Sequence, residues 1–267
     1  MRTGAISFPK INESQINEDA VRVGEKLIAV SDGAGGGGVF ADLWSKYLVN
    51  HLPDAPLNTF DKLDTWLSQI WETFYNECEI KAKQEGGMLL DKFYEEGSFA
   101  TLSAVWRTSN RKCHWIAYGD SVAFHYNFDT KRLEHSFSAL KDFANPPFLI
   151  NCKDELSSEG FRTGIFSTNK QSVVFVASDA VAHYILSLYK LAHRNEYEQE
   201  LQDAKNQPSK HASLINSIEN SIKTIDFNRK LTILLNNGER HLHNAFAKGY
   251  LGHDDCSFAF MDFRAVK

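Results

Sequence analysis

The chain has 267 residues, 43% of them hydrophobic, so it can bury a substantial core, and we expect a single domain over residues 1–267. A formal net charge of -5 without any basic run argues against a nucleic-acid partner and against an anionic membrane surface. With four scattered cysteines, no signal peptide and no apolar run near the roughly 20 residues of a membrane span, we expect a cytoplasmic protein with reduced thiols.

The first half of the chain alternates short strands with two helices. Strands are predicted over Thr3 to Phe8, Ala20 to Val23 and Lys26 to Ser31, and helices over Val39 to His51 and Asp61 to Gln84. Apolar residues of the longer helix recur every three or four positions, which is the spacing of a helix that covers a sheet. The Gly86-Gly87 pair is expected to end that helix.

Beyond Gly97 the chain changes to consecutive strands. Phe99 to Arg107, Lys112 to Ala117 and Val122 to Asn127 are joined by short polar connections, which favour an antiparallel meander. Further strands are predicted over residues 172–177 and 256–263, and a helix over 181–191. The polar stretch that follows this helix predicts a helical insertion on the surface, at about residues 194–226.

A glycine-rich turn follows the third predicted strand. This strand stops at Asp32, and five of the next six residues are glycine. Gly33, Gly35 and Gly38 satisfy the G-x-G-x-x-G pattern of dinucleotide-binding turns, with Asp54 near the position of a ribose-binding acid. Alternatively, Asp32 and the open backbone around it hold a hard metal ion, for which carboxylate and carbonyl oxygens are suitable ligands.

Three predicted strands end in the same way. Asp32, Asp120 and Asp179 each follow a small residue at the carboxyl end of a strand, and Asp254 precedes the last strand. Because antiparallel neighbours place the end of one strand beside the beginning of the next, these acids can meet at one edge. Crowded carboxylates repel one another, and divalent cations neutralise them. Ligation by oxygen alone indicates Mg²⁺ or Mn²⁺ rather than Zn²⁺.

A simpler interpretation exists for each of these acids taken alone. An aspartate after a strand is commonly a turn residue or the N-cap of a helix. The recurrence of the pattern at several strand ends favours the metal site. The dinucleotide interpretation is weaker, because residues 53–61 contain no second apolar strand and the later strands are consecutive.

Six short motifs occur in a fixed order along the chain. They are Asn17-Glu18-Asp19-Ala20, Ser31-Asp32-Gly33-Ala34-Gly35-Gly36, Gly97-Ser98-Phe99-Ala100, Gly119-Asp120-Ser121, Ala177-Ser178-Asp179 and Asp254-Asp255-Cys256-Ser257. Together they resemble the ordered motifs of the metal-dependent type 2C protein serine/threonine phosphatases, in their bacterial form. The resemblance implies an α+β fold: a four-layer αββα sandwich of two mostly antiparallel sheets flanked by helices.

The resemblance also implies a site for two Mn²⁺ or Mg²⁺ ions and a weaker third. Its metal ligands would be Glu18, Asp32, the carbonyl of Gly33, Asp179, Asp254 and, for the third ion, Asp120. Asp32 would bridge the first two ions, and catalysis would depend on Asp32, Asp179 and Asp254. Asp19 and Asp255 would position these ligands without binding an ion themselves. The ions would activate water for direct hydrolysis of a phosphate ester.

The sequence departs from the family pattern at several positions. Ser14 stands where the family commonly has an arginine that binds substrate phosphate, and Ala34 stands where some members have a histidine. Ala180 and Asp255 replace the usual glycine and the frequent asparagine after their acids. Two functions therefore stay open. The first is a phosphoserine/phosphothreonine protein phosphatase that opposes a protein kinase in signalling, and the second is a weakly active or inactive regulatory or binding module with the same fold.

Overall fold

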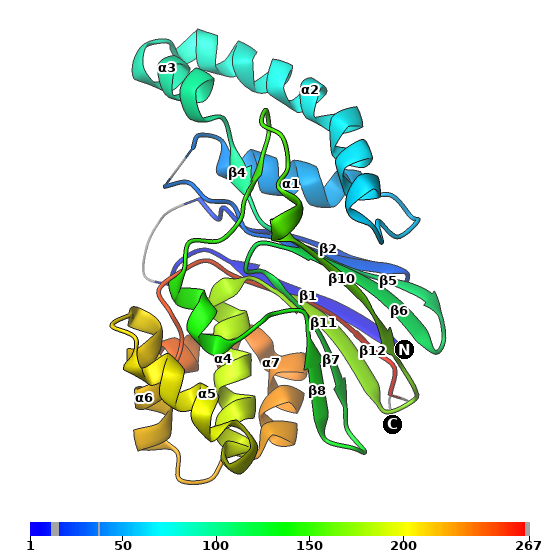
Figure 1. The fold of residues 1–267 in the computed structure, drawn as a ribbon, viewed down its shortest axis with the longest axis vertical. Coiled ribbons are helices and arrows are strands. Elements are labelled where there is room, and N and C mark those ends of the chain that lie inside the picture. The colour runs from blue at the N-terminus through cyan, green and yellow to red at the C-terminus, as the bar shows by residue number, and fades with distance from the viewer. Residues whose placement is uncertain (12–15, 37, 265–267) are drawn as a thin grey trace.

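The computed structural model describes residues 1–11, 16–36 and 38–264. Two five-stranded sheets pack face to face, and helices cover the outer side of each sheet (Figure 1). This is the α+β four-layer sandwich that the sequence predicts, and that prediction is confirmed. No helix of the described ranges is long and apolar enough to cross a membrane.

The first sheet has the strand order β1-β12-β11-β7-β8, and all its neighbours are antiparallel. Its strands are β1 (Arg2–Phe8), β12 (Cys256–Asp262), β11 (Ser172–Ala177), β7 (Val122–Asn127) and β8 (Arg132–His135). The pairing of β1 with β12 places Arg2 beside Asp262.

The second sheet has the order β10-β6-β5-β3-β2 and is also antiparallel throughout. Its strands are β10 (Phe161–Ser167), β6 (Lys112–Tyr118), β5 (Leu102–Ser109), β3 (Leu27–Ser31) and β2 (Ala20–Val23). A separate short ladder joins β4 (Phe99–Ala100) to β9 (Ile150–Asn151). It lies beside the glycine-rich turn after β3, where Ala34 donates to the carbonyl of Phe99.

The predicted meander of three strands is only partly correct. β5 and β6 pair as expected, but β7 leaves that sheet and joins the other one between β11 and β8. Gly119 has a φ of 87°, a left-handed conformation that glycine adopts without strain. A side chain there would also collide with the carbonyl oxygen of Phe148. A short polar connection therefore carries the chain across the sandwich rather than back along the same sheet.

Side chains along the central strands point alternately to the two faces of each sheet, and this produces three apolar layers. In β3, Leu27 and Ala29 pack toward the helices, whereas Ile28 and Val30 pack between the two sheets. All five residues of β3 are buried, as expected for a strand that is covered on both faces. The strand that leads to Asp32 is therefore fixed on both sides.

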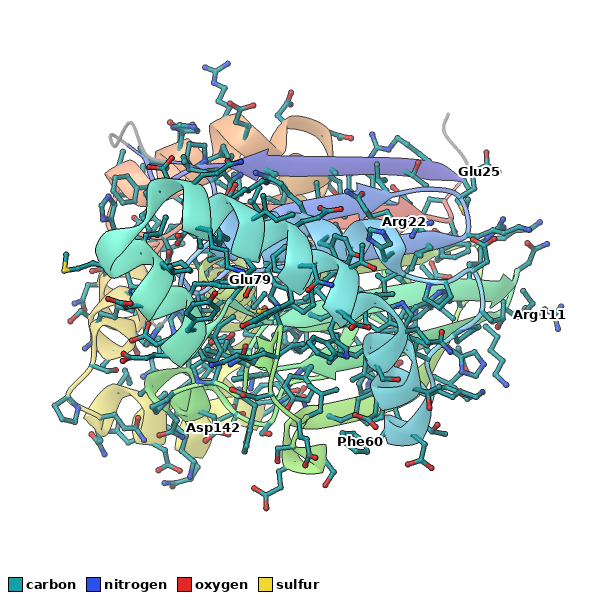
Figure 2. All side chains as sticks on the ribbon, turned by 90° about the horizontal axis from the view of Figure 1, so that it is seen from above. Arg22, Glu25, Phe60, Glu79, Arg111 and Asp142 are labelled. Atoms are coloured by element: carbon teal, nitrogen blue, oxygen red, sulfur yellow. The ribbon has the colours of Figure 1, made fainter. Side chains whose placement is uncertain are left out.

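Three helices cover the second sheet: α1 (Ala41–His51), α2 (Phe60–Glu85) and α3 (Gly87–Glu96). In the view of Figure 2, α2 runs along the outside from Phe60 past Glu79. The glycine pair does end α2, but α3 begins again at Gly87. The first helix begins two residues later than predicted, because Phe40 adopts a left-handed φ of 56°.

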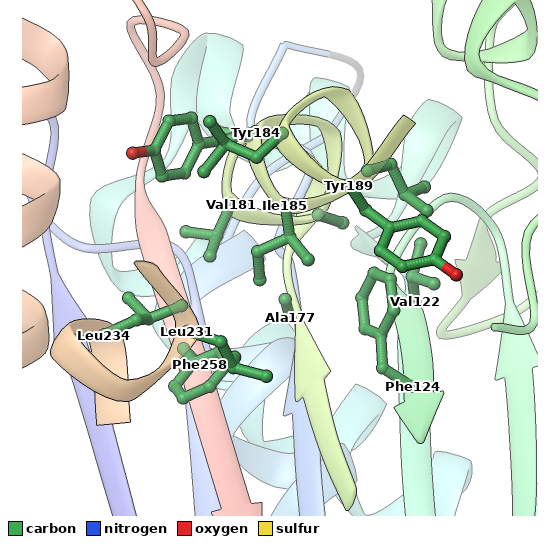
Figure 3. Close-up of a cluster of buried hydrophobic side chains, with 14 of the residues drawn as sticks. Val122, Phe124, Ala177, Val181, Tyr184, Ile185, Tyr189, Leu231, Leu234 and Phe258 are labelled. Atoms are coloured by element: carbon green, nitrogen blue, oxygen red, sulfur yellow. The ribbon is translucent and has the colours of Figure 1, made fainter. Parts of the chain in front are cut away.

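Four helices cover the first sheet: α4 (Asp179–Ala192), α5 (Arg194–Asn206), α6 (Lys210–Ser221) and α7 (Phe227–Ala247). Figure 3 shows Val181 and Ile185 of α4 and Leu231 of α7 packed over strand residues Ala177 and Phe258. The buried ammonium of Lys190 on α4 pairs with Glu200 on α5, and Glu200 also accepts the backbone N–H of Leu140. This pair ties α5 to α4 and to the short helix η1 (Leu140–Ala144).

Candidate active site

A pocket of about 320 Å³ opens at one end of the sandwich. Five acidic residues line it: Glu18, Asp32, Asp120, Asp179 and Asp254. Gly33 lines it as well, so all six residues that the sequence predicts as metal ligands lie around one cavity. All five acids are half-buried.

The strand topology explains why these acids meet. Asp32 follows β3 and Asp120 follows β6, and both of these strands are antiparallel to β5, which lies between them. Their carboxyl ends therefore lie at the same end of one sheet. In the other sheet, β11 ends just before Asp179 and its antiparallel neighbour β12 begins just after Asp254. Each sheet thus contributes two aspartates to the same end of the sandwich.

Asp32 is held in place by Thr101, which the sequence analysis did not single out. The backbone N–H of Thr101 donates to the carbonyl of Asp32 at 2.8 Å, and the Thr101 hydroxyl lies 3.3 Å from the N–H of Asp32. The same hydroxyl lies 2.6 Å from that of Ser121, next to Asp120. The hydroxyl of Ser31 donates to the Thr101 carbonyl at 2.6 Å. Thr101 therefore fixes the backbone on which two of the acids stand.

The glycine-rich turn leaves space for Glu18. A Cβ atom at Gly35 would lie 1.9 Å from a carboxylate oxygen of Glu18, so any side chain there would displace that acid. A Cβ atom at Gly33 would lie 2.6 Å from the backbone oxygen of Glu18 and 2.7 Å from that of Ala41. The glycines serve close approach of backbone and carboxylate, and they form no dinucleotide-binding turn between two parallel strands, because β3 has only antiparallel neighbours.

Substituting Gly33 by alanine should destabilise the protein by about 1–3 kcal/mol, because two backbone oxygens must move to admit the methyl group. Gly36 supplies the matched control, since a Cβ atom there meets nothing within 4 Å. The free energies of unfolding from urea titrations of G33A and G36A test this. Equal stability of the two variants would contradict the close packing around Gly33.

Asp19 and Asp255 lie behind the pocket and differ in the hydrogen bonds that their carboxylates accept. Asp255 accepts the backbone N–H groups of Lys10 at 2.9 Å and Glu18 at 2.7 Å, so it fixes the backbone at both of these residues. Both carboxylate oxygens of Asp19 are buried, and no hydrogen bond of normal geometry satisfies them. Burial and the charge of Asp255 raise the pKa of Asp19 to about 7, and this effect outweighs the nearby hydroxyls of Ser178 and Ser257.

Asp120 is positioned by an arginine that the sequence analysis also missed. Arg162, on β10, donates to the carbonyl of Gly119, and its guanidinium lies 5.4 Å from the centre of the Phe137 ring. Burial raises the pKa of Asp120 to about 6, although its own backbone N–H and the charge of Arg162 both act to lower it. The arginine therefore orients the turn and only partly neutralises the acid.

Asp179 and Asp254 come from the first sheet. Asp179 is the first residue of α4, where the helix dipole favours a negative charge, and its carboxylate accepts the N–H of Ala180 at 2.5 Å. The Asp254 side chain is 33% exposed and forms ion pairs with two lysines. Its carboxylate oxygens lie 3.4 Å from Nζ of Lys10 and 3.9 Å from Nζ of Lys210.

The electrostatics of the pocket favour binding of hard cations. Burial and the neighbouring aspartates raise the pKa of both Asp32 and Asp179 well above the ordinary value. The ionised form of these carboxyl groups is therefore disfavoured unless a positive charge lies nearby. The donors of the five acids and of the Gly33 carbonyl are all oxygens, which suits Mg²⁺ or Mn²⁺. Among the described residues, however, no three acidic, histidine or cysteine side chains are grouped as the ligands of one ion.

Several further residues line the pocket although no sequence motif indicates them. They are Phe143, Asn145, Pro147, Leu149, Lys210 and His211. Burial lowers the pKa of His211 to about 4, so this imidazole is neutral at pH 7 and is a poor proton donor. Ser14, where the sequence analysis notes a missing arginine, lies outside the described residues.

No model of a known protein family matches the sequence, and no curated protein matches it. Solved structures do match the fold over its whole length. The serine/threonine phosphatase PstP/Ppp of Mycobacterium tuberculosis superposes with a TM-score of 0.56 and 15% identity, covering 99% of both chains. PppA of Pseudomonas aeruginosa, a regulatory component of its type VI secretion system, has a TM-score of 0.54 and 17% identity, covering 97% of this chain and 96% of PppA.

A third similar structure contains metal. The catalytic domain of the serine/threonine phosphatase PstP, in complex with two manganese ions, superposes with a TM-score of 0.53 and 15% identity. The match covers 97% of this chain and 96% of that one. The chain therefore has the fold of bacterial serine/threonine phosphatases. At this level of identity the likeness establishes the fold alone.

Proposed function

We propose that this protein is an Mn²⁺- or Mg²⁺-dependent phosphatase that hydrolyses phosphoserine and phosphothreonine in other proteins. One observation carries the proposal: five carboxylates from both sheets surround a single pocket, and those of Asp32 and Asp179 have strongly raised pKa values. A fold that gathers so much uncompensated negative charge is suited to hold divalent cations. When bound, such cations activate water as a nucleophile and stabilise the charge on a phosphoryl group.

The position of each acid indicates which cation it would hold. Asp32, Glu18 and the carbonyl of Gly33 would hold one cation, and Asp179 and Asp254 would complete the site for a second, with Asp32 shared. Asp120 would hold a weaker third ion. Thr101 keeps the backbone of Asp32 in place through two hydrogen bonds, so the shared ligand does not depend on the cations for its position.

The natural partner would be a phosphorylated protein together with the kinase that modifies it. The similar structures support this choice, because they are serine/threonine phosphatases. Ser14 favours a second candidate, a regulatory module that keeps the fold and the cations but turns over slowly, since a hydroxyl cannot replace a guanidinium as a phosphate clamp.

Phosphate release from phosphoserine and phosphothreonine peptides separates these two functions. We expect release in the presence of Mn²⁺ or Mg²⁺ and none with a chelator, whereas a phosphotyrosine peptide of the same sequence serves as the control substrate. Metal binding without any release would support the regulatory module. Absence of metal binding, measured by calorimetry, would contradict both.

A further inference from the structure

Two lysines from distant parts of the chain reach the same carboxylate at the mouth of the pocket. Nζ of Lys10 lies 3.4 Å from one oxygen of Asp254, and Nζ of Lys210 lies 3.9 Å from the other. In the part of the chain that the structure describes, they are the only lysine or arginine residues that line the pocket. All other charged groups that line it are acids.

The backbone at both lysines is fixed. The N–H of Lys10 donates to Asp255 at 2.9 Å, which holds the residue beside the pocket. Lys210 is the first residue of α6, whose N-cap Ser209 accepts the N–H of Ala212. Buried apolar side chains of α6, among them Ile215 and Ile218, seat this helix in the core of the first sheet.

The helices α5 and α6 are also held together by charge. Glu219 on α6 pairs with Arg194 at 2.6 Å and with Lys205 at 2.9 Å, both on α5. Because α5 is in turn tied to α4 through the buried pair of Lys190 and Glu200, the start of α6 is placed firmly at the pocket. The segment predicted as a surface insertion thus contributes a cation to the candidate active site.

Stability does not explain these two ion pairs. The Lys210 side chain is 62% exposed and its distance to Asp254 is long, and pairs of this kind contribute only about 0–1 kcal/mol. The Lys210 side chain can therefore leave Asp254 at little cost, and the pair of Lys10 with Asp254 is itself partly exposed, at 26% and 33%. A phosphoryl group that enters the pocket meets several carboxylates and needs positive charge nearby. A lysine ammonium is a mobile point charge that suits phosphate oxygens.

We propose that Lys10 and Lys210 bind the phosphoryl group of the substrate at the pocket mouth, and that Asp254 holds the two ammonium groups there beforehand. This inference rests on the proposed phosphatase function. It assigns the recognition of phosphate to two lysines contributed by the N-terminal segment and by α6. It also gives the α5–α6 segment a role at the site.

Binding of inorganic phosphate tests the inference independently of turnover. We would titrate phosphate into the magnesium-loaded protein by calorimetry at low ionic strength, for Lys10→Gln, Lys210→Gln and the double variant. Each single substitution should weaken phosphate binding about fivefold, the effect of losing one partly exposed charge, and the double variant should weaken it by about 25-fold. Lys210→Arg should bind phosphate within about twofold of wild type, because the charge remains.

Two further readouts separate phosphate recognition from damage to the metal site. Lys83→Gln, which removes an exposed lysine paired with Glu79 on α2, is the matched control and should change nothing. Magnesium affinity should be equal or tighter in the two glutamine variants, since Asp254 loses a competing cation. On a phosphopeptide, the loss should appear mainly in KM and little in kcat.

The outcomes distinguish this inference from the proposed function. If the double variant binds phosphate as tightly as wild type, the lysines do not recognise phosphate. If the affinities for phosphate and for magnesium fall together, the lysines only position the Asp254 carboxylate for metal binding, and the inference is again wrong. If wild type binds phosphate through the lysines but hydrolyses no phosphopeptide, the inference stands and the phosphatase function fails.

Discussion

The Asp32→Asn variant should lose manganese-stimulated phosphatase activity by about a hundredfold or more. Removing even a residue that supports a metal ligand costs roughly 10–100-fold, so loss of the shared ligand should cost more. Asparagine keeps the shape of the side chain and the hydrogen bonds of the backbone to Thr101. The fold should therefore persist while the affinity for the cations falls.

The same substitution should raise the stability of the protein in the presence of a chelator. Burial and neighbouring aspartates raise the pKa of Asp32, so its ionised form is disfavoured in the folded protein at neutral pH. Asp91→Asn, on the exposed face of α3, is the matched control and should affect neither property. Steady-state kinetics with manganese and urea titrations with EDTA measure the two effects. Wild-type turnover in Asp32→Asn would mean that the site lies elsewhere.

Manganese should raise the melting temperature by about 5 °C at pH 8 when it is present at roughly 100 times its dissociation constant. The increase in melting temperature should be smaller at pH 5 than at pH 8, and the raised pKa values of the pocket acids explain this direction. Burial is the main cause that raises the pKa of Asp120 to about 6 and of Asp19 to about 7. Groups with a raised folded-state pKa stabilise the fold below their ordinary pKa near 4, and this contribution disappears as the pH rises through about 6 to 7.

Above that window the carboxylates are ionised and repel one another, so a cation gains most there. Below it, protons already neutralise them and compete with the metal. Melting curves with manganese and with EDTA at pH 5 and pH 8 give the two differences, and effects of pH elsewhere in the protein cancel within each pair. An equal increase at both pH values would show that manganese binds outside this carboxylate cluster.

The sequence predicts the central strands because both of their faces are buried. β7 and β11 lie inside their sheet and have the bounds that their apolar runs predict. The edge strands β8 and β10 were missed, because an edge strand buries few residues and carries little apolar pattern, as Arg132 and the exposed Ile165 illustrate. The helix α3 is not predicted, because the Gly86-Gly87 pair indicates only the end of the preceding helix.

The candidate site also contains residues that the sequence predicts and residues that it does not. The acids at strand ends could be predicted, because a carboxylate after an apolar strand is a local signal that recurs along the chain. Thr101 and Arg162 could not, since their roles depend on hydrogen bonds to residues far away in the sequence. Lys210 lies in a polar segment that looks like any solvated helix surface. Only the packing of α6 brings it to Asp254.

Anomalous diffraction from crystals grown with manganese tests the central claim most directly, because it locates the cations without any assumption about substrate. The account predicts strong manganese peaks within coordination distance of the carboxylates of Asp32 and Asp179. A map with no peak beside Asp32, at a manganese concentration that saturates the change in melting temperature, would contradict it.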